Sequence, residues 1–396
     1  MNAPLPLPAL DDIRAHEAEM VAIRQQIHAN PELAYEEHAT SDLVAERLAR
    51  WGYEVHRGLG GTGVVGTLRE GTSSRRIGLR ADMDALPIAE TSGKAWASKV
   101  FGKMHACGHD GHTAMLLSAA RHLAATRNFD GHLHLVFQPA EEGLAGAKKM
   151  LDDGFLELFP CDAMFGMHNM PGRPEGQFMA VPGFAMASGD TCIIKVKGVG
   201  GHGAMPQAAV DPIVAASAIV MSLQTIVSRN VPPLQTGIIS VGAFLAGDAA
   251  NVIPGEAELR LTVRAFHPDI RDLLERRITE IAHAQAAVYG ATAHVHYDRR
   301  YPVLQNDPAQ TEFCKQVVRD WLGPEGMLDE TDPVTGSEDF AFFLEKVPGC
   351  YVFIGNGEGE LGGCMVHNPG YDFNDRVLPT GASYWVRLAE SYLKAL

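Results

Sequence analysis

Three short apolar runs in the first half of the chain are each followed at once by acidic or imidazole side chains. Asp82 and Asp84 follow the run 77–81, Glu141 and Glu142 follow 132–137, and His168 follows 163–167. Runs of this length, separated by helical stretches, are typical of the buried strands of an α/β sheet. Ligands of such sheets bind at the carboxyl ends of the strands, so we expect these side chains to converge on one place.

The middle of the chain has a different order of predicted elements. It contains a strand (191–196), a glycine turn (198–203), a helix (211–228), two strands (237–243 and 256–264), a helix (269–289) and a last strand (291–296). This β-α-β-β-α-β order is that of a ferredoxin-like domain. We therefore predict an α/β domain formed by residues 1–184 and 298–396, which carries the converging side chains, with an inserted ferredoxin-like α+β domain at residues 185–297.

Composition limits the class of partner. The 396 residues are 46% hydrophobic, enough for two cores, and carry a net charge of −15, from 33 basic and 48 acidic residues. Nucleic acid and anionic membranes both require a basic surface, so we expect neither as a partner. Residues 1–10 lack the features of a secretory signal, and we expect no run near the roughly 18 apolar residues of a membrane helix. The six scattered cysteines indicate reduced thiols and a cytoplasmic protein.

The segment 104–112 places three imidazoles, a thiol and a carboxylate within nine residues. Together with Glu142, His168 and His367 it offers more ligands than one divalent cation needs, so we expect two ions and hydrolytic chemistry. Other histidines are interpreted as polar residues of helices or sheet faces and stay outside the site: His105, His112, His122, His132 and His134.

Six motifs, in order over nearly the whole chain, resemble those of the N-acyl-amino-acid amidohydrolases. These enzymes include hippurate hydrolases, aminoacylases, carboxypeptidases and auxin-conjugate hydrolases, within a wider family of two-metal aminoacylases and dipeptidases. The motifs are Cys107-Gly-His109-Asp-Gly-His, Gln-Pro-Ala-Glu141-Glu142-Gly, Gly-Gly-His202-Gly-Ala-Met-Pro, Asn251-Val-Ile-Pro, Gly336-Ser-Glu-Asp-Phe-Ala and His367-Asn-Pro-x-Tyr-Asp-Phe-Asn.

The resemblance implies that the larger domain has the mixed-sheet α/β/α fold of two-metal hydrolases (aminopeptidase/carboxypeptidase-like), with a site for two divalent ions. Its metal ligands would be Cys107, His109, Glu142, His168 and His367, with Glu141 as general base and Asp84 as a carboxylate that orients a ligand. The wider family has a histidine where this chain has Asp82, and a bridging aspartate in the region of Cys107. The bridging atom therefore stays open, as does the choice among zinc, manganese, cobalt and nickel.

The resemblance also implies a homodimer. His202, in a glycine turn of the inserted domain, would stabilise the oxyanion in the active site of the partner subunit. The substrate carboxylate would bind to Asn251, Arg264 and the backbone at Gly336, although Arg260 and Arg264 can also be read as ordinary strand residues.

The expected function is hydrolysis of N-acyl amino acids, such as hippurate-like or N-acetyl compounds, by metal-activated water. The closer alternative is a dipeptidase or aminopeptidase of the same two-metal fold. The more distant alternative is a zinc-stabilised binding protein without catalytic activity, in which protein ligands would occupy every position around the ion.

Overall fold

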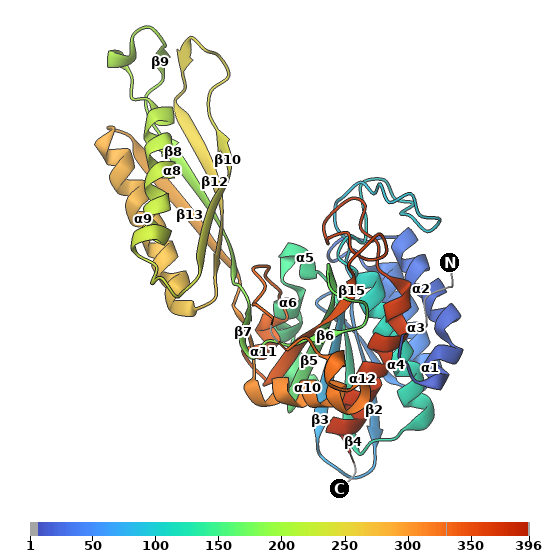
Figure 1. The fold of residues 1–396 in the computed structure, drawn as a ribbon. Coiled ribbons are helices and arrows are strands. Elements are labelled where there is room, and N and C mark those ends of the chain that lie inside the picture. Colours follow the sequence, from blue (N-terminus) through green and yellow to red (C-terminus); the bar gives the residue numbers. More distant parts are fainter. Residues whose placement is uncertain (1–6, 330, 395–396) are drawn as a thin grey trace. The chain divides into compact units, whose positions relative to one another are not determined.

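The computed structural model describes residues 7–329 and 331–394, which form two compact units (Figure 1). The first unit consists of the chain up to Gly183 together with Gln305–Asp332 and the chain from Phe342 onward. The second unit consists of Phe184–Leu304 and Pro333–Ala341. Of the N-terminal residues in which we expect no secretory signal, residues 1–6 lie outside the described part.

The first unit is built on a seven-stranded sheet with the order β1-β2-β4-β3-β5-β15-β6. Its central strands β4, β3, β5 and β15 are parallel, whereas β1, β2 and β6 pair antiparallel. The bounds are β1 Glu54–Leu59, β2 Gly63–Glu70, β3 Arg76–Asp82, β4 Gly131–Gln138, β5 Ala163–Pro171, β6 Phe178–Met179 and β15 Gly349–Gly357. The predicted mixed-sheet α/β fold is confirmed.

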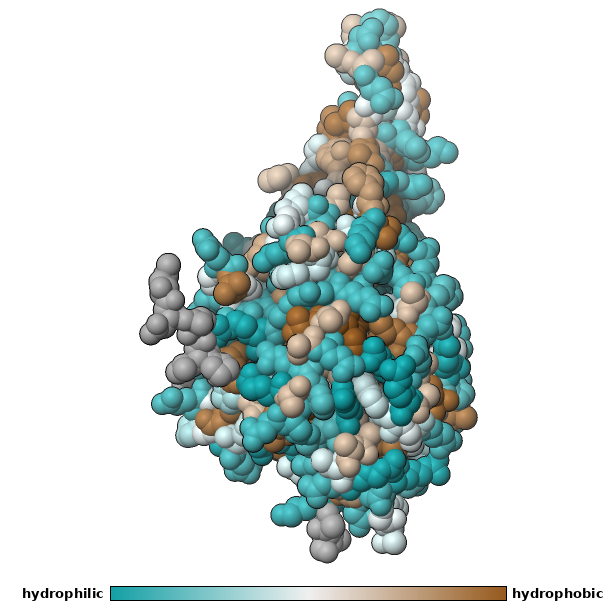
Figure 2. All heavy atoms as spheres, turned by 90° about the vertical axis from the view of Figure 1, so that its right-hand side faces the viewer, coloured by the Kyte–Doolittle hydropathy of each residue, from teal (hydrophilic) through white to brown (hydrophobic). Residues whose placement is uncertain are grey.

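Helices surround this sheet, and α4 packs against both α2 and α12. The longer helices are α2 Glu17–Ala29, α3 His38–Arg50, α4 His109–Thr126, α10 Pro308–Leu322 and α12 Leu378–Tyr392. The shorter ones are α1 Asp11–Ala15, α5 Glu141–Leu144, α6 Gly146–Asp152, α7 Phe155–Leu158 and α11 Ala341–Leu344. The face of the first unit that Figure 2 turns to the viewer is mostly hydrophilic, with scattered apolar side chains.

The second unit has a four-stranded antiparallel sheet with the order β10-β12-β8-β13 and two helices, α8 and α9, that pack on it. The bounds are β8 Gly189–Lys197, α8 Pro212–Arg229, β10 Gly237–Leu245, β12 Glu256–Ala265, α9 Pro268–Val288 and β13 Thr292–Tyr301. A small ribbon of β9 (Gly201–His202) and β11 (Val252–Ile253) is added to this β-α-β-β-α-β order. This is the expected ferredoxin-like topology.

The second unit is larger than the range 185–297 that the sequence pattern indicates. Strand β13 continues to Tyr301, which pairs with Gly189 of β8. The distant segment Pro333–Ala341 also belongs to it, because Val334 forms a bridge with Met186. A short pair of strands, β7 (Gly183–Met186) and β14 (Leu304–Asn306), lies where the chain enters and leaves this unit.

The expectation about apolar runs is wrong for helix α8. Residues 212–228 carry no charge, and α8 is the one helix in the described residues that by length and composition is able to cross a membrane. Its apolar character has a structural explanation, because one side packs in the core of the second unit. The buried residues on this side are Ala215, Ala216, Ile219, Leu223 and Ile226.

Candidate metal centre

A tight turn at the start of α4 carries Cys107 and His109. Gly108 between them has a φ of +96°, in the left-handed region that favours glycine. A Cβ at this position would lie 2.3 Å from Nδ2 of Asn169 and 2.5 Å from the hydroxyl of Tyr371. Glycine is therefore required here, both for the conformation and for the close approach of neighbouring side chains.

Glu141 and Glu142 lie in an irregular turn directly after β4. Ala140 before them has a φ of 54°, and Gly143 after them has a φ of 85°. The backbone N–H groups of Glu141 and Glu142 donate to the carboxylate oxygens of Asp84, over 3.0 and 2.9 Å. These bonds hold the backbone of both glutamates beside Asp84, which follows the end of β3.

His109 has one nitrogen occupied and one free. Its Nδ1 lies 3.2 Å from Oδ1 of Asp84, which makes Nδ1–H the donor. Its Nε2 is buried and has no hydrogen-bond partner among the described residues. A histidine that binds a metal offers one ring nitrogen to the ion, and its other ring nitrogen commonly donates to a carboxylate. His109 meets both conditions, with Nε2 available to an ion and Nδ1 donating to Asp84.

The charges around His109 attract a cation. Burial by itself lowers the pKa of the imidazole, but the carboxylates of Asp82, Asp84 and Glu142 outweigh burial and raise this pKa to about 10. The same negative charge that holds a proton on the ring in the absence of a metal also favours a divalent ion in its place.

Cys107 and His168 lie next to each other, with Sγ 3.2 Å from Nε2. The Nδ1–H of His168 donates to the carbonyl of Asn169, which directs the lone pair of Nε2 toward the thiol. Burial raises the pKa of the Cys107 thiol well above its usual value, and the nearby Glu142, Glu141 and Asp82 raise it further. Only a bound cation would stabilise a thiolate in these surroundings.

His367 reaches the same place from the C-terminal part of the first unit. Its backbone has a φ of 64°, and its N–H donates to the carbonyl of Ala106 over 2.7 Å. Its Nε2 lies 3.2 Å from Oε1 of Glu142, and this contact raises the pKa of His367. The imidazole therefore reaches Glu142 because a left-handed backbone conformation directs it there.

The five side chains predicted as ligands, together with Glu141, form three overlapping groups, and within each group the donor atoms lie within 4.8 Å of one another. The groups are Cys107, His109 and His168; Cys107, Glu142 and His367; and His109, Glu141 and Glu142. Thiolate, imidazole and carboxylate donors in this mixture suit first-row divalent metals.

A fourth group, formed by Asp82, His109 and His112, has another function. Asp82 contacts Arg80 and Nδ1 of His112, each over 2.6 Å. Nε2 of His112 accepts a hydrogen bond from the backbone N–H of Asn169 over 3.0 Å. Both nitrogens of His112 are therefore used, and this histidine belongs to a buried hydrogen-bond network. Its interpretation as a polar residue outside the donor set agrees with these contacts.

Sequence reasoning missed Asn169. Its Nδ2 donates to the carbonyl of Cys107 over 2.7 Å, and its Oδ1 accepts from the hydroxyl of Tyr371 over 2.8 Å. The side chain therefore holds the backbone of the turn that carries Cys107. The sequence did contain a signal for this role, because Asn169 directly follows His168 after the predicted strand 163–167.

The remaining predicted site residues lie in the second unit, in two groups. His202 and Asn251 are neighbours, because His202 pairs with Val252 and the N–H of Gly203 donates to the carbonyl of Asn251 over 2.8 Å. His202 itself is exposed, and its Nδ1 accepts from the N–H of Ala204 over 3.0 Å.

Arg264 lies near the segment that contains Gly336. A Cβ placed on Gly189 would lie 2.5 Å from Oγ of Ser337 and 3.9 Å from Cζ of Arg264, so Gly189 leaves room for both. Arg264 donates to the neutral oxygens of Thr262 and Val263, over 2.6 and 3.0 Å. Arg260, by contrast, pairs with Glu258 on the exposed side of the sheet, as an ordinary strand residue would.

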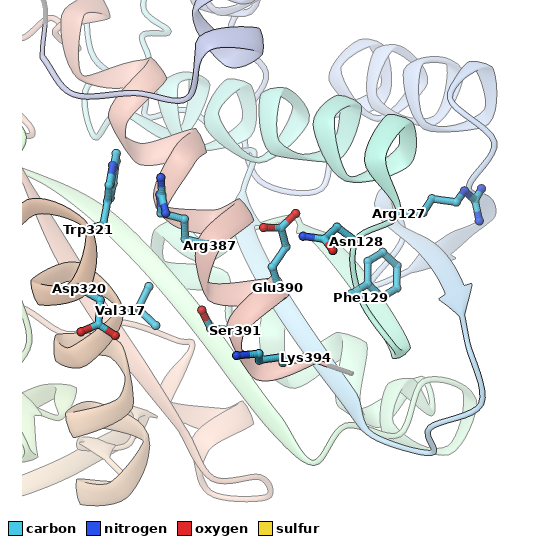
Figure 3. Close-up of a pocket in the computed structure, with 10 residues that line it drawn as sticks. All are labelled: Arg127, Asn128, Phe129, Val317, Asp320, Trp321, Arg387, Glu390, Ser391 and Lys394. Carbon is cyan, nitrogen blue, oxygen red and sulfur yellow. The ribbon is translucent and has the colours of Figure 1, made fainter. Parts of the chain in front are cut away.

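A cavity of about 570 Å³ lies elsewhere in the first unit, between α10, α12 and the residues after α4 (Figure 3). It is lined by three basic and two acidic side chains, and the guanidinium of Arg387 lies 5.0 Å from the ring centroid of Trp321. None of the donor residues lines this cavity. The donor set, and not cavity size, therefore identifies the candidate site.

Comparisons with known proteins identify the family of this chain. The family model described as Peptidase family M20/M25/M40 matches residues 78–391. The hippurate hydrolase of Campylobacter jejuni is 45% identical over 388 residues, covering 98% of this chain and 99% of the relative. The N-acetylcysteine deacetylase of Bacillus subtilis is 36% identical over 390 residues, covering 97% and 99%. The crystal structure of a dinuclear metal binding peptidase from M20 family of Bacillus subtilis matches with a TM-score of 0.82 and 33% identity, covering 97% of this chain and 100% of that one.

Proposed function

Because this chain belongs to the peptidase family M20/M25/M40, we propose that it is a metal-dependent amidohydrolase that cleaves the amide bond of N-acyl amino acids. The observation that carries this proposal is the connected donor set from the start of α4, the turn after β4, strand β5 and the segment after β15, with the buried Glu141 beside it. A site that only stabilised the fold would have no use for a further carboxylate next to its ligands.

The metal centre of the proposal holds two divalent ions, bound by Cys107, His109, Glu142, His168 and His367. The overlap of the donor groups supports two ions, because Cys107 and His109 each belong to more than one group. A thiolate favours zinc, and the imidazole and carboxylate ligands also suit manganese, cobalt or nickel. Bound there, the ions would lower the pKa of a water molecule and polarise the amide carbonyl.

Glu141 is the general base in this proposal. Its side chain is 6% exposed, and its backbone N–H is held by Asp84. The carboxylate takes a proton from the attacking water and passes it to the nitrogen of the leaving amine. Asp84 keeps His109 in the tautomer that leaves Nε2 free, and it fixes the backbone of both glutamates.

Arg264 and the backbone at Gly336 bind the substrate carboxylate in this proposal, and Asn251 supports His202. Arg264 is partly buried and donates to neutral oxygens, so its charge is available to a carboxylate. Asn251 lies beside His202 through the β9–β11 ribbon and not beside Arg264.

The enzyme is a homodimer in which His202 serves the partner's site. His202 lies beyond one end of β12, whereas Arg264 lies near its other end, and the ten residues of this strand span about 30 Å. An N-acyl amino acid is about two residues long, roughly 7 Å. If both side chains bind one substrate, they belong to different copies of the chain, which supports a site shared between two copies.

The surface of the second unit supports this dimer. Strand β10 is an edge strand, and it exposes Phe244 by 40% and Leu245 by 48%. Helix α8 exposes Val214 by 49% and Met221 by 71%, without a charged residue between them. Edge strands and exposed apolar side chains are expected to be covered by a second copy. A cytoplasmic location is supported by the free state of all six cysteines.

A comparison of two substrates on the metal-loaded enzyme tests the proposed reaction. Hippurate, with a blocked nitrogen, should be cleaved with a higher kcat/KM than an unblocked dipeptide that ends in the same glycine. Preferential cleavage of the dipeptide would instead identify a dipeptidase or aminopeptidase. Absence of hydrolysis of either substrate, with metal bound, would favour a binding protein.

A further inference from the structure

Glu37, at the start of α3, is a fully buried carboxylate to which the mechanism above gives no role. Its Oε1 accepts hydrogen bonds from the backbone N–H groups of Tyr35 and Ala140, over 3.0 and 2.9 Å. Its Oε2 accepts from the hydroxyl of Thr62 over 2.6 Å. Burial of a carboxylate is unfavourable unless such donors satisfy it, and an apolar side chain would fill this space without that penalty.

The hydrogen bond from Ala140 to Glu37 is one of three that hold the backbone of the turn carrying Glu141 and Glu142. Three successive backbone N–H groups, those of Ala140, Glu141 and Glu142, all donate to buried carboxylates. Glu37 accepts the first, and Asp84 accepts the second and third. Ala140 has a φ of 54°, which is unfavourable for a residue with a Cβ and persists only where the surroundings hold it.

The same segment also contacts the turn on its far side. The hydroxyl of Tyr35 donates to the carbonyl of Leu144 over 2.9 Å, and Tyr35 itself has a φ of 64°. Residues 35–37 therefore contact the turn both before and after Glu141 and Glu142. Tyr35 and Ala140, both in the left-handed region, donate their backbone N–H groups to the same oxygen of Glu37.

We propose that Glu37 is a positioning residue that sets the directions of Glu141 and Glu142 by holding Ala140 in its left-handed conformation. It touches neither the reacting atoms nor the donor groups, so its effect passes through the backbone. The proposal rests on the roles given above to Glu141 and Glu142. Small displacements of a reacting group reduce turnover strongly, which makes such a contact effective.

Two variants of Glu37 and one matched control test this proposal. Glu37→Met keeps the length of the side chain and removes every acceptor, whereas Glu37→Gln keeps one oxygen that can accept from Ala140 and Tyr35. Glu32→Met is the control, because Glu32 lies five residues before Glu37 and its side chain also accepts three hydrogen bonds. The donors are the backbone N–H groups of Ala39 and Thr40 and the hydroxyl of Thr40. These bonds hold the start of α3 and not the turn.

The first measurement is amide hydrogen exchange of a peptide covering residues 139–145 in metal-free protein, which requires neither substrate nor metal. We expect Glu37→Met to speed exchange at least tenfold, Glu37→Gln to stay within threefold of the parent chain, and Glu32→Met to leave this peptide unchanged. Unchanged exchange in Glu37→Met would overturn the proposal, whatever reaction the enzyme catalyses.

The second measurement separates kcat from KM for an N-acyl amino acid at saturating metal. We expect Glu37→Met to lower kcat at least tenfold with KM within threefold, and Glu37→Gln to restore most of kcat. Glu32→Met should lower the melting temperature by a similar amount and keep kcat. Equal losses of kcat in Glu37→Met and Glu32→Met would show a general loss of stability and would overturn a positioning role.

Discussion

Nδ1 of His109 lies 3.2 Å from Oδ1 of Asp84, and the same oxygen accepts a hydrogen bond from the backbone N–H of Glu141 over 3.0 Å. One carboxylate oxygen thus contacts both a proposed metal ligand and the proposed general base. Oδ2 of Asp84 accepts from the N–H of Glu142 over 2.9 Å. Asp84 therefore links the end of β3, the start of α4 and the turn after β4.

Replacement of Asp84 by asparagine should weaken metal binding. The amide keeps the shape of the side chain but has one acceptor oxygen for three donors. Loss of such a contact behind a ligating imidazole typically lowers metal affinity about 10–100-fold, and we expect a change of this size in competition titrations with a chelator. Asp162→Asn, which affects only a contact to the N–H of Arg76, is the control. Equal affinities of Asp84→Asn and the parent chain would contradict the assignment.

Metal content should approach two ions per chain in protein prepared without chelator. The three overlapping donor groups together offer more ligands than one ion needs. Elemental analysis measures this value directly. Removal of the ions with excess chelator should abolish hydrolysis, and Cys107→Ala should lose at least one ion because a charged ligand is absent. Full activity in excess chelator, or two ions bound to Cys107→Ala, would exclude the proposed centre.

Glu141→Gln should separate catalysis from metal binding. Glutamine keeps the size of the side chain but cannot accept the proton from water, so kcat should fall by at least about 10²–10⁴-fold. Metal content should stay unchanged, which elemental analysis of the same sample checks. A variant that loses metal together with activity would identify Glu141 as a ligand instead, and near-normal turnover would remove it from the mechanism.

Mixed dimers test the contribution of His202 to the partner's site. Glu141→Gln and His202→Ala chains should each be inactive, and their mixture should regain roughly a quarter of the parent activity. This value follows because about half of randomly assorted dimers are mixed, and one of the two sites in each mixed dimer is intact. Free exchange of subunits without any recovered activity would show that His202 does not act across the dimer.

Stability should fall at alkaline pH through His28. This buried imidazole lies 2.8 Å from a carboxylate oxygen of Asp110. Burial lowers its pKa, but Asp110 and Glu90 outweigh burial and raise the pKa from 6.5 to about 9. Because the folded value lies above the unfolded one, the stabilisation is fully present below pH 6.5 and is lost as the pH rises through about 9.

His28 should contribute about 3 kcal/mol to the loss in the free energy of unfolding of metal-free protein between pH 6.5 and pH 9.5, in addition to the loss from His109, whose pKa is also raised. Urea unfolding at both values measures it. His28→Gln should show a smaller change over the same interval, because its side chain does not titrate. An identical pH dependence in both proteins would show that another group is responsible.

Much of the fold follows from local sequence patterns. Apolar runs with turns between them mark strands and helices, and the acids after two of these runs mark the carboxyl ends of β3 and β4. Strand β5 is longer than its apolar run indicates, because it continues past His168 to Pro171. The β-α-β-β-α-β order of the second unit was predictable because it depends on residues that are close in the chain. The mixed sheet of the first unit followed only from the resemblance, because strands as distant in the chain as β5 and β15 pair in it. The bounds of α8 were predicted closely, but its apolar character was misjudged, because a core helix with one exposed apolar side has the same composition as a membrane helix.

Other features depend on contacts between distant residues. His109 and His112 lie one helical turn apart in the same motif, and only the positions of Asp82 and Asn169 decide that His112 has no nitrogen left for a metal while Nε2 of His109 is free. Glu37 is separated from Ala140 by 103 residues, and Pro333–Ala341 joins the second unit through a bridge to Met186. The amino-acid sequence alone thus determined which residue types are present and the elements that carry them. The tertiary structure decided which of their polar atoms remain free, because each hydrogen bond uses a donor or acceptor that no local pattern can assign.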